Sequence, residues 1–333
     1  MESLIVILGI TGNQGASVAD VFLKEKGWKL RGITRDVTKQ SSQTWSQKGV
    51  EMVQADLNNP ESLRKAFEGA KVIFAVTDFW TPMYDLYNYG KLRQGQSISE
   101  FCYDLELQQG KNVADAAASI ETLERFVFSG LVNIKNTTKG KYTWVYHFDA
   151  KAAVMEYIKT SLPDLNRKSS ELQLAEYATN WRVWKLRQLH KQDDGTFAML
   201  LPGDSMAGAA FVVPRIDTGY FVRALVNLPP GKKLLGYGSF LNHEEYVRIW
   251  TGILGVPNGG VKRITVEEAA AFEGGPHGRG VAETFASVLE VNFLDDSFMH
   301  PRQIPNKEIE CPTTNIEEYL KSQDFSSMLQ RTP

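Results

Sequence analysis

Short apolar runs alternate with helix-like patterns through the first half of the chain. The runs are bounded by polar and turn-forming residues, as in buried strands, and the segments between them carry apolar side chains at helical spacing. The expected strands are residues 4–8, 29–34, 50–54, 71–76 and 125–128. The expected helices are residues 14–26, 60–67, 97–120 and 146–159. This alternation predicts βαβ units, and therefore an α/β fold with a parallel sheet.

The regular alternation ends after about residue 160. Two later segments have strand-like composition, and a third predicts a strand and helix that return to the core. These segments are residues 181–185, 197–201 and 209–226. Asn242 is expected to begin another helix, because Glu245 stands three positions later and completes a capping box.

These patterns predict a Rossmann fold, a doubly wound parallel sheet, with a smaller discontinuous C-terminal α/β lobe. We expect the core to comprise residues 1–160 and a return segment at about 205–235. The lobe would then comprise about 161–204 and 236–333. Ligands of such folds bind at the carboxyl ends of the strands, so the site is expected between core and lobe.

Composition and charge narrow the function only slightly. Of 333 residues, 43% are hydrophobic and 23% are charged, which is ordinary for a soluble globular protein. The net charge of −2 gives no electrostatic reason to expect direct nucleic-acid binding. Cys102 and Cys311 are far apart and in no metal-binding spacing, so we expect free thiols and no metal site. Without a secretory signal or an apolar stretch of roughly 20 residues, a cytoplasmic or nuclear protein, away from membranes, is expected.

The strongest chemical signal is the glycine-rich loop after the first expected strand. It runs Gly9-Ile10-Thr11-Gly12-Asn13-Gln14-Gly15, directly before a helical pattern. Glycines let the backbone turn sharply and approach a diphosphate, while the helix N-terminus offers free N–H groups to the anion. Asn13 and Gln14 carry amides that can donate to phosphate oxygens. We therefore expect a dinucleotide to bind here; the alternative is a tight turn without a ligand.

The end of the second expected strand bears on the choice of cofactor. Arg35 stands 20 residues after Gly15, where a carboxylate would bind a ribose 2′-hydroxyl and an arginine accommodates a 2′-phosphate. Thr34 and Lys39 can add a hydroxyl and a charge. These residues favour NADP(H) over NAD(H), although Asp36 follows directly and an exposed Arg–Asp turn is the alternative.

Two further strand ends are expected to line the cofactor. Asp56 and Leu57 follow the third strand, where the adenine ring would lie, and a simple helix-entry turn is the competing interpretation. Thr77 and Phe79 follow the fourth strand and would lie toward the ribose and nicotinamide. The aromatic side chain of Phe79 is equally compatible with packing in the lobe core.

The fifth strand is followed by the residues expected to carry catalysis. Ser129 ends that strand, and His147 and Lys151 then stand four residues apart, on one helix face. Short-chain dehydrogenases carry a tyrosine and a lysine at this spacing, so Lys151 is expected to bind the nicotinamide ribose. His147 replaces the tyrosine and is a candidate acid; a structural histidine is the alternative. Tyr146 is one residue out of register, about 100° around the helix.

Together these motifs resemble the NmrA-like family of atypical short-chain dehydrogenases, in particular its fungal members, over about residues 3–300. The motifs are Gly9 to Gly15, Thr34-Arg35, Ser129-Gly130, His147-Phe148-Asp149-x-Lys151, Glu176-Tyr177-x-Thr179-Asn180-Trp181, Asp217 to Val222 and Leu228 to Gly231. The resemblance implies a Rossmann core, a small C-terminal lobe and NAD(P) binding. Some members of the family are redox-sensing transcriptional regulators, and relatives are NADPH-dependent reductases that use a lysine without the tyrosine.

Three functions remain open at this point. The first is an oxidoreductase that transfers hydride from NADPH to a carbonyl, imine or conjugated alkene of a hydrophobic substrate, possible in secondary metabolism. The second is a non-catalytic NAD(P) sensor that binds a transcription factor or another protein. The third is a catalytically inactive structural relative. An oligomer is compatible with each of them.

Overall fold

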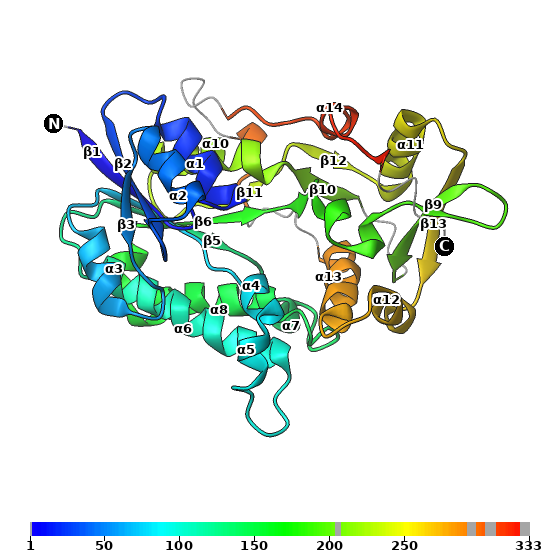
Figure 1. Cartoon of the computed structure of the whole chain (residues 1–333), viewed down its shortest axis with the longest axis horizontal. Helices are drawn as coiled ribbons and strands as arrows, with labels where there is room; N and C mark the ends of the chain where they lie inside the picture. The colour runs from blue at the N-terminus through cyan, green and yellow to red at the C-terminus, as the bar shows by residue number, and fades with distance from the viewer. Residues whose placement is uncertain (1, 204–207, 292–297, 304–310, 327–333) are drawn as a thin grey trace.

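The computed structural model describes residues 2–203, 208–291, 298–303 and 311–326 of the chain. Two parts lie side by side (Figure 1). The core contains the large sheet, and the lobe is built mainly from later residues. Some limits of the expected core and lobe lie outside the described residues. They are residues 204 and 205, where the first lobe segment ends and the return segment begins, and residue 333, where the lobe ends. No helix within these ranges is both long and apolar enough to cross a membrane.

The core is a seven-stranded sheet in which every pair of neighbouring strands is parallel. In spatial order its strands are β11 (Lys233–Gly236), β6 (Ser169–Leu174), β5 (Arg125–Gly130), β4 (Val72–Ala75), β1 (Ser3–Ile7), β2 (Trp28–Thr34) and β3 (Glu51–Gln54). This order confirms the predicted doubly wound Rossmann fold. The chain reverses its direction of winding between β1 and β4, so the crevice at their carboxyl ends is the expected ligand site.

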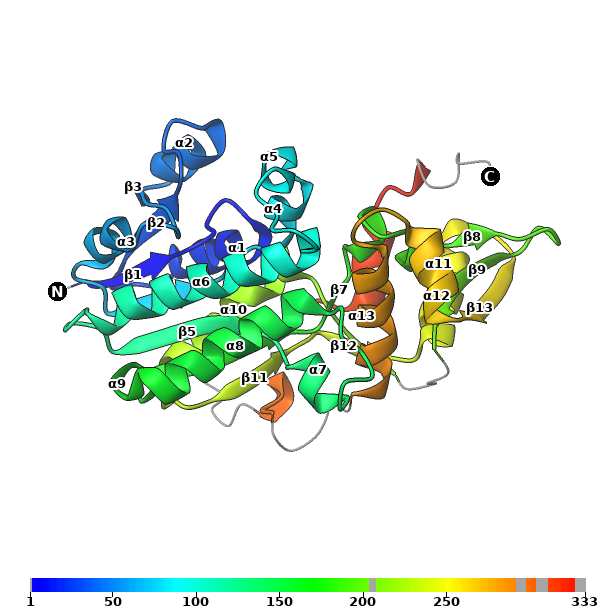
Figure 2. The same ribbon diagram turned by 90° about the horizontal axis from the view of Figure 1, so that it is seen from below.

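Helices cover both faces of the sheet because β1 is apolar on both faces. Ile5 and Ile7 pack with α1 (Asn13–Phe22) and α10 (Pro214–Asn227). Val6 and Leu8 pack on the opposite face, under α3 (Pro60–Phe67), α6 (Ile98–Ala118) and α8 (Tyr146–Ser161), as Figure 2 shows. The remaining core helices are α2 (Gln40–Gln47), α4 (Trp80–Tyr84), α5 (Leu86–Tyr89), α7 (Ile134–Thr137) and α9 (Pro163–Asn166).

The lobe contains two small sheets and several helices. One sheet orders β12 (Ser239–Leu241), β10 (Ala209–Val212) and β7 (Glu176–Tyr177), and the other orders β13 (Asn258–Ile264), β9 (Phe197–Pro202) and β8 (His190–Lys191). Its α-helices are α11 (His243–Leu254), α12 (Val266–Glu273), α13 (Gly278–Glu290) and α14 (Ile316–Lys321). Short 3₁₀ turns of the lobe are η1 (Asn180–Arg182) and η2 (Lys185–Arg187), whereas η3 (Pro301–Gln303) lies beside β11 of the core sheet. The predicted capping box of Asn242 and Glu245 is confirmed at the start of α11.

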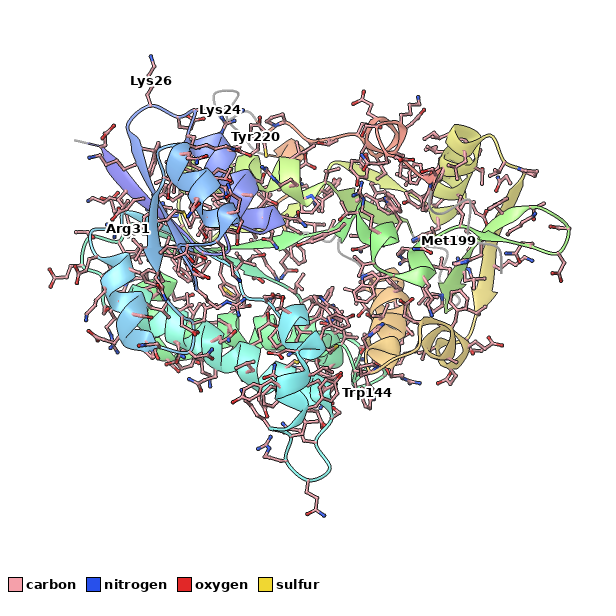
Figure 3. All side chains as sticks on the ribbon, viewed as in Figure 1. Lys24, Lys26, Arg31, Trp144, Met199 and Tyr220 are labelled. Atoms are coloured by element: carbon pink, nitrogen blue, oxygen red, sulfur yellow. The ribbon has the colours of Figure 1, made fainter. Side chains whose placement is uncertain are left out.

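Helix α13 ties the lobe to the loop before α8. The carboxylate of Glu283 is almost fully buried, and its Oε2 atom accepts the backbone N–H groups of Thr143 and Trp144, each at 2.7 Å. Its Oε1 atom accepts Arg279 Nε at 2.6 Å. Trp144, labelled in Figure 3, lies beside the lower end of α13. One buried carboxylate therefore holds the two parts together near the end of the sheet where the site is expected.

Three details of the structure differ from the sequence prediction. Residues 181–185 form 3₁₀ turns instead of a strand, because the carbonyl of Asn180 accepts the N–H groups of Val183 and Trp184 and closes a local turn. Residues 169–174, expected in the lobe, form β6 of the core sheet. The expected return segment is divided: β10 joins a lobe sheet, whereas α10 packs on α1. Gly219 permits that packing, since a Cβ there would lie 2.3 Å from the carbonyl oxygen of Ser17.

Candidate functional site

The glycine loop forms a bare backbone turn at the end of β1. Gly9 has a φ of +65°, and its carbonyl accepts the N–H of Gly12 at 2.9 Å. A Cβ on Gly15 would lie 2.4 Å from the oxygen of Gly9, so only glycine fits there without moving the loop. Thr11 and Asn13 are exposed, and the first N–H groups of α1 have no acceptor within the helix. This cradle has the shape and polarity that a diphosphate requires.

Gln14 connects the glycine loop to the lobe. Its side-chain Nε2 donates to the hydroxyl of Tyr177 on β7, with 2.7 Å between nitrogen and oxygen. This bond uses one of the two N–H donors of the Gln14 amide, and its contact with a phosphate remains a prediction. Burial raises the pKa of Tyr177 to about 12, so this hydroxyl stays protonated at neutral pH. The contact joins the glycine loop to a lobe strand that follows 163 residues later.

At the end of β2, the side chains of Arg35 and Asp36 have different surroundings. Asp36 Oδ1 accepts both the N–H and the hydroxyl of Thr38, at 2.8 and 2.6 Å, and these bonds lower the pKa of Asp36. The carboxylate is therefore engaged in its own turn. Arg35 is exposed and forms no ion pair with other described residues. Lys39 is also exposed and caps α2, so two cations lie in this short segment.

The loop after β3 is held by its own hydrogen bonds. Asp56 Oδ1 accepts the N–H and the side-chain amide of Asn58, at 2.8 and 2.9 Å. The carbonyl of Leu57 accepts Asn112 Nδ2 from α6 at 2.8 Å, and the Leu57 side chain packs against the core. These contacts fix the loop at the sheet edge, and contact with an adenine ring remains a prediction for both residues.

Lys151 reaches the end of β4, where it forms a buried polar cluster. Its Nζ donates to the carbonyl and hydroxyl oxygens of Thr77, at 3.0 and 2.9 Å, and to Glu106 Oε1. Thr77 Oγ1 also donates to Glu106 Oε1, at 2.7 Å. A lysine ammonium has three N–H donors, and all three are used here. Lys151 thus lies at the end of β4 with a buried carboxylate as its partner, and its contact with a nicotinamide ribose remains a prediction.

Sequence reasoning missed Glu106. Its carboxylate is 0% exposed and lies on the face of α6 that contains buried Cys102 and Val113. The available signal was a charged residue in the buried stripe of an expected helix, since Glu106 is four positions after Cys102 and seven before Val113. Fully buried carboxylates are rare unless paired, so a cationic partner is expected for a carboxylate at this position. The chain position of Lys151, 45 residues later, gave no indication of the partner.

His147 lies among aromatic rings one helical turn before Lys151. Its ring centroid is 4.8 Å from that of Trp80, 4.9 Å from that of Phe148 and 5.6 Å from that of Phe79. Burial, and secondarily the charge of Lys151, lower the pKa of His147 to about 3. The imidazole is therefore neutral at physiological pH, and these surroundings favour packing over proton donation. Phe79 is also buried, and it packs with Met83 in a small core cluster.

Aromatic contacts continue from α4 into the lobe. The ring centroids of Trp80 and Trp184 are 4.8 Å apart, and those of Trp184 and His277 are 5.5 Å apart. Tyr84 contacts His277 at 5.6 Å and is half exposed. Ser129 is buried at the end of β5. The same edge of the sheet thus combines a polar cluster with an apolar bridge between core and lobe. Within the described ranges, no three His, Cys, Asp or Glu residues are grouped to hold a metal ion.

Comparison with known proteins identifies what this arrangement resembles. Residues 1–258 match the profile of the NmrA-like family. The NmrA-like family domain-containing oxidoreductase cpsB of Aspergillus campestris is 32% identical over 155 residues, which are 46% of this chain and 40% of the relative. The NmrA-like oxidoreductase FrzB of Cladobotryum is 33% identical over 157 residues, 47% of this chain and 40% of the relative. The match thus spans less than half the length of each of these relatives.

Solved structures share the fold at low sequence identity. The negative transcriptional regulator NmrA in complex with NAD has a TM-score of 0.68 and 18% identity, with 96% of this chain and 95% of that chain covered. Triphenylmethane reductase of Citrobacter sp., complexed with NADP(H), has a TM-score of 0.64 and 20% identity, with 96% and 99% covered. One neighbour is thus a regulator and the other a reductase.

Proposed function

The chain belongs to the NmrA-like family, and on this premise we propose that it is an NADP(H)-dependent oxidoreductase that reduces a hydrophobic substrate. The substrate class is a carbonyl, imine or conjugated alkene. The observation that carries the proposal is the bare backbone turn from Gly9 to Gly15, whose tight shape leaves no room for a side chain at Gly15 because a Cβ there would collide with the backbone of Gly9 and Ile10. The names of the curated relatives, which are oxidoreductases, support the same class.

The residues that would hold the cofactor follow the edge of the sheet. Backbone N–H groups at the start of α1 would bind the diphosphate, since they are exposed and lie at the positive end of the helix dipole. Arg35 and Lys39 would bind a 2′-phosphate, because Asp36 is engaged with Thr38. The preference for NADP(H) over NAD(H) rests on these two cations. Leu57 and Asp56 would border the adenine.

At the other end of the cofactor, Thr77 and Lys151 would position the reacting part. A bound reduced nicotinamide supplies the hydride. Lys151 would bind a ribose hydroxyl by exchanging one of its two bonds to Thr77, since its ammonium has no unused N–H. His147 is neutral near pH 7, so we assign proton supply to Lys151 or to a water molecule that it orients. Trp80 and Trp184 would exclude water and contact an apolar substrate.

One observation favours a second function, a sensor that binds NAD(P) without catalysis. The position of the usual catalytic tyrosine holds His147, whose low pKa removes it as an acid, and Lys151 has all its donors engaged. A sensor would couple the nucleotide to a protein partner, and the contact between Gln14 and Tyr177 links the glycine loop to the lobe. Such coupling requires that the nucleotide bind two protein states with different affinity.

Turnover separates the two functions. The protein is incubated with NADPH and a panel of keto, imine and enone compounds, and the absorbance of reduced nicotinamide is followed. An oxidoreductase oxidises NADPH with at least one compound, and Lys151→Met abolishes that oxidation. A sensor binds NADPH without oxidising it, and a protein partner co-purifies with it only in the presence of nucleotide. If neither NADPH nor NADH binds to the protein, both functions are rejected.

A further inference from the structure

Lys151 and Glu106 form an ion pair that is withdrawn from solvent. The Lys151 side chain is 11% exposed and that of Glu106 is 0% exposed. Glu106 Oε1 accepts from two groups, Lys151 Nζ and Thr77 Oγ1, so the three side chains form a closed hydrogen-bonded ring. Within the described part of the chain, Glu106 Oε2 has no hydrogen-bond partner. The carboxylate therefore serves Lys151 and Thr77 alone.

A lone ammonium at this position would have two costs. Burial disfavours the charged form of lysine, and the cation would repel any positively charged group bound nearby. Oxidised nicotinamide carries a positive charge on its ring, whereas reduced nicotinamide does not. A buried carboxylate in direct contact with the ammonium removes both costs, because the pair has no net charge.

We propose that Glu106 is a positioning residue that keeps Lys151 protonated and electrically compensated, so that the site binds oxidised as well as reduced nicotinamide. This inference rests on the proposed binding of NADP(H) and adds to it a residue that controls the affinity ratio of the two redox forms. Thr77 orients the pair toward the end of β4 through its carbonyl and hydroxyl oxygens.

The other titratable groups around the pair leave a clear pH window. Cys102 lies one turn before Glu106 on α6, and burial together with the charges of Glu106 and Asp78 raises its pKa to about 12. His147 faces the pair from α8 with a pKa of about 3. Asp78, on the loop after β4, accepts the N–H groups of Trp80 and Thr81. Neither Cys102 nor His147 changes charge between about pH 6 and about pH 9, given those values.

The test measures dissociation constants of NADP⁺ and NADPH for the wild-type chain and the Glu106→Gln variant across that window. In the wild type, the ratio of the two constants should not change with pH. In Glu106→Gln, the uncompensated ammonium should weaken NADP⁺ relative to NADPH by roughly tenfold at about pH 6, as expected for repulsion between two neighbouring unit charges at an effective dielectric constant of about 20. Toward about pH 9 the ratio should return to the wild-type value, because an unpaired buried lysine loses its proton more easily.

Asp104→Asn is the matched control, because Asp104 lies on the same helix but its side chain is 53% exposed and pairs with Arg93. Its affinity ratio should equal that of the wild type. An unchanged ratio in Glu106→Gln at every pH, with both nucleotides bound, would overturn the inference. Failure of the wild type to bind either nucleotide would instead reject the proposed function.

A second measurement is made on the wild-type protein and does not depend on the folding of Glu106→Gln or on nucleotide binding. Nitrogen-detected NMR of lysine ammonium groups should show one slowly exchanging signal that is absent from Lys151→Met, because a fully hydrogen-bonded ammonium is protected from solvent. The absence of that signal would also overturn the inference.

Discussion

Substitution of Gly15 by alanine tests the glycine cradle most simply. The added Cβ would lie 2.4 Å from the oxygen and 2.5 Å from the carbonyl carbon of Gly9, and 2.7 Å from the nitrogen of Ile10. All three contacts are with backbone, so no side-chain rotation relieves them. An ordinary carbon–oxygen contact is about 3.5 Å, so the loop must shift by roughly 1 Å. Overpacking of this kind costs about 1–3 kcal/mol of stability.

The same shift should also weaken nucleotide binding. A misplacement of about 1 Å costs up to about a hundredfold in the rate of reactions between positioned groups, and we expect a loss of similar order for the hydrogen bonds to the diphosphate. Titration of NADPH, followed by its fluorescence, should therefore show an affinity loss of about 30-fold or more in Gly15→Ala. Gly252→Ala is the matched control, because no atom lies within 4 Å of its added Cβ and the residue is within helix α11. Equal affinity of Gly15→Ala and wild type would refute the assignment of this loop to the diphosphate.

Three further predictions concern other parts of the site. Arg35→Glu should weaken NADPH about tenfold or more and NADH much less, as measured by calorimetry, since a charge-assisted phosphate contact of about 1.5–3 kcal/mol is lost; equal losses would exclude Arg35 from the 2′-phosphate. His147→Phe should make the free energy of unfolding less sensitive to acid. The pKa of His147 is about 3 in the folded chain and about 6.5 in the unfolded chain, so below pH 6.5 the unfolded chain binds an extra proton. The wild-type chain therefore loses stability as the pH falls from 6.5 toward 3. Urea titrations at about pH 7 and about pH 5 measure this, and an unchanged pH dependence would show that the imidazole is not held neutral. Glu283→Ala should lower the free energy of unfolding by about 2–4 kcal/mol, because the N–H groups of Thr143 and Trp144 lose their acceptor; a loss below about 0.5 kcal/mol would contradict that contact.

The core could be predicted from sequence because its signals are local. An apolar strand, a glycine loop and a helix follow one another within residues 3–22, and each is specified by neighbouring residues. Lys151 was identified from a helical spacing, and its helix brings it to the end of β4. Helix α2 was missed because its sequence, QSSQTWSQ, buries only Ser42 and Trp45 and presents no apolar stripe.

The partners of the site residues were beyond sequence reasoning, since they depend on packing between distant segments. Glu106 meets Lys151 only because α6 and α8 lie side by side on one face of the sheet. Gln14 meets Tyr177 only because β7 joins a lobe sheet next to the glycine loop. The strand expected at residues 181–185 was wrong for a similar reason: the side chain of Trp181 packs against Trp250 and Phe325 from a 3₁₀ turn.

The central claim is that the turn from Gly9 to Gly15 binds the diphosphate of a nicotinamide dinucleotide. Isothermal titration of NADPH into the folded wild-type chain tests it most directly. The account predicts a single site with micromolar affinity and a weaker response to NADH. The absence of binding heat for both nucleotides at millimolar concentration, with the chain shown to be folded by circular dichroism, would contradict it.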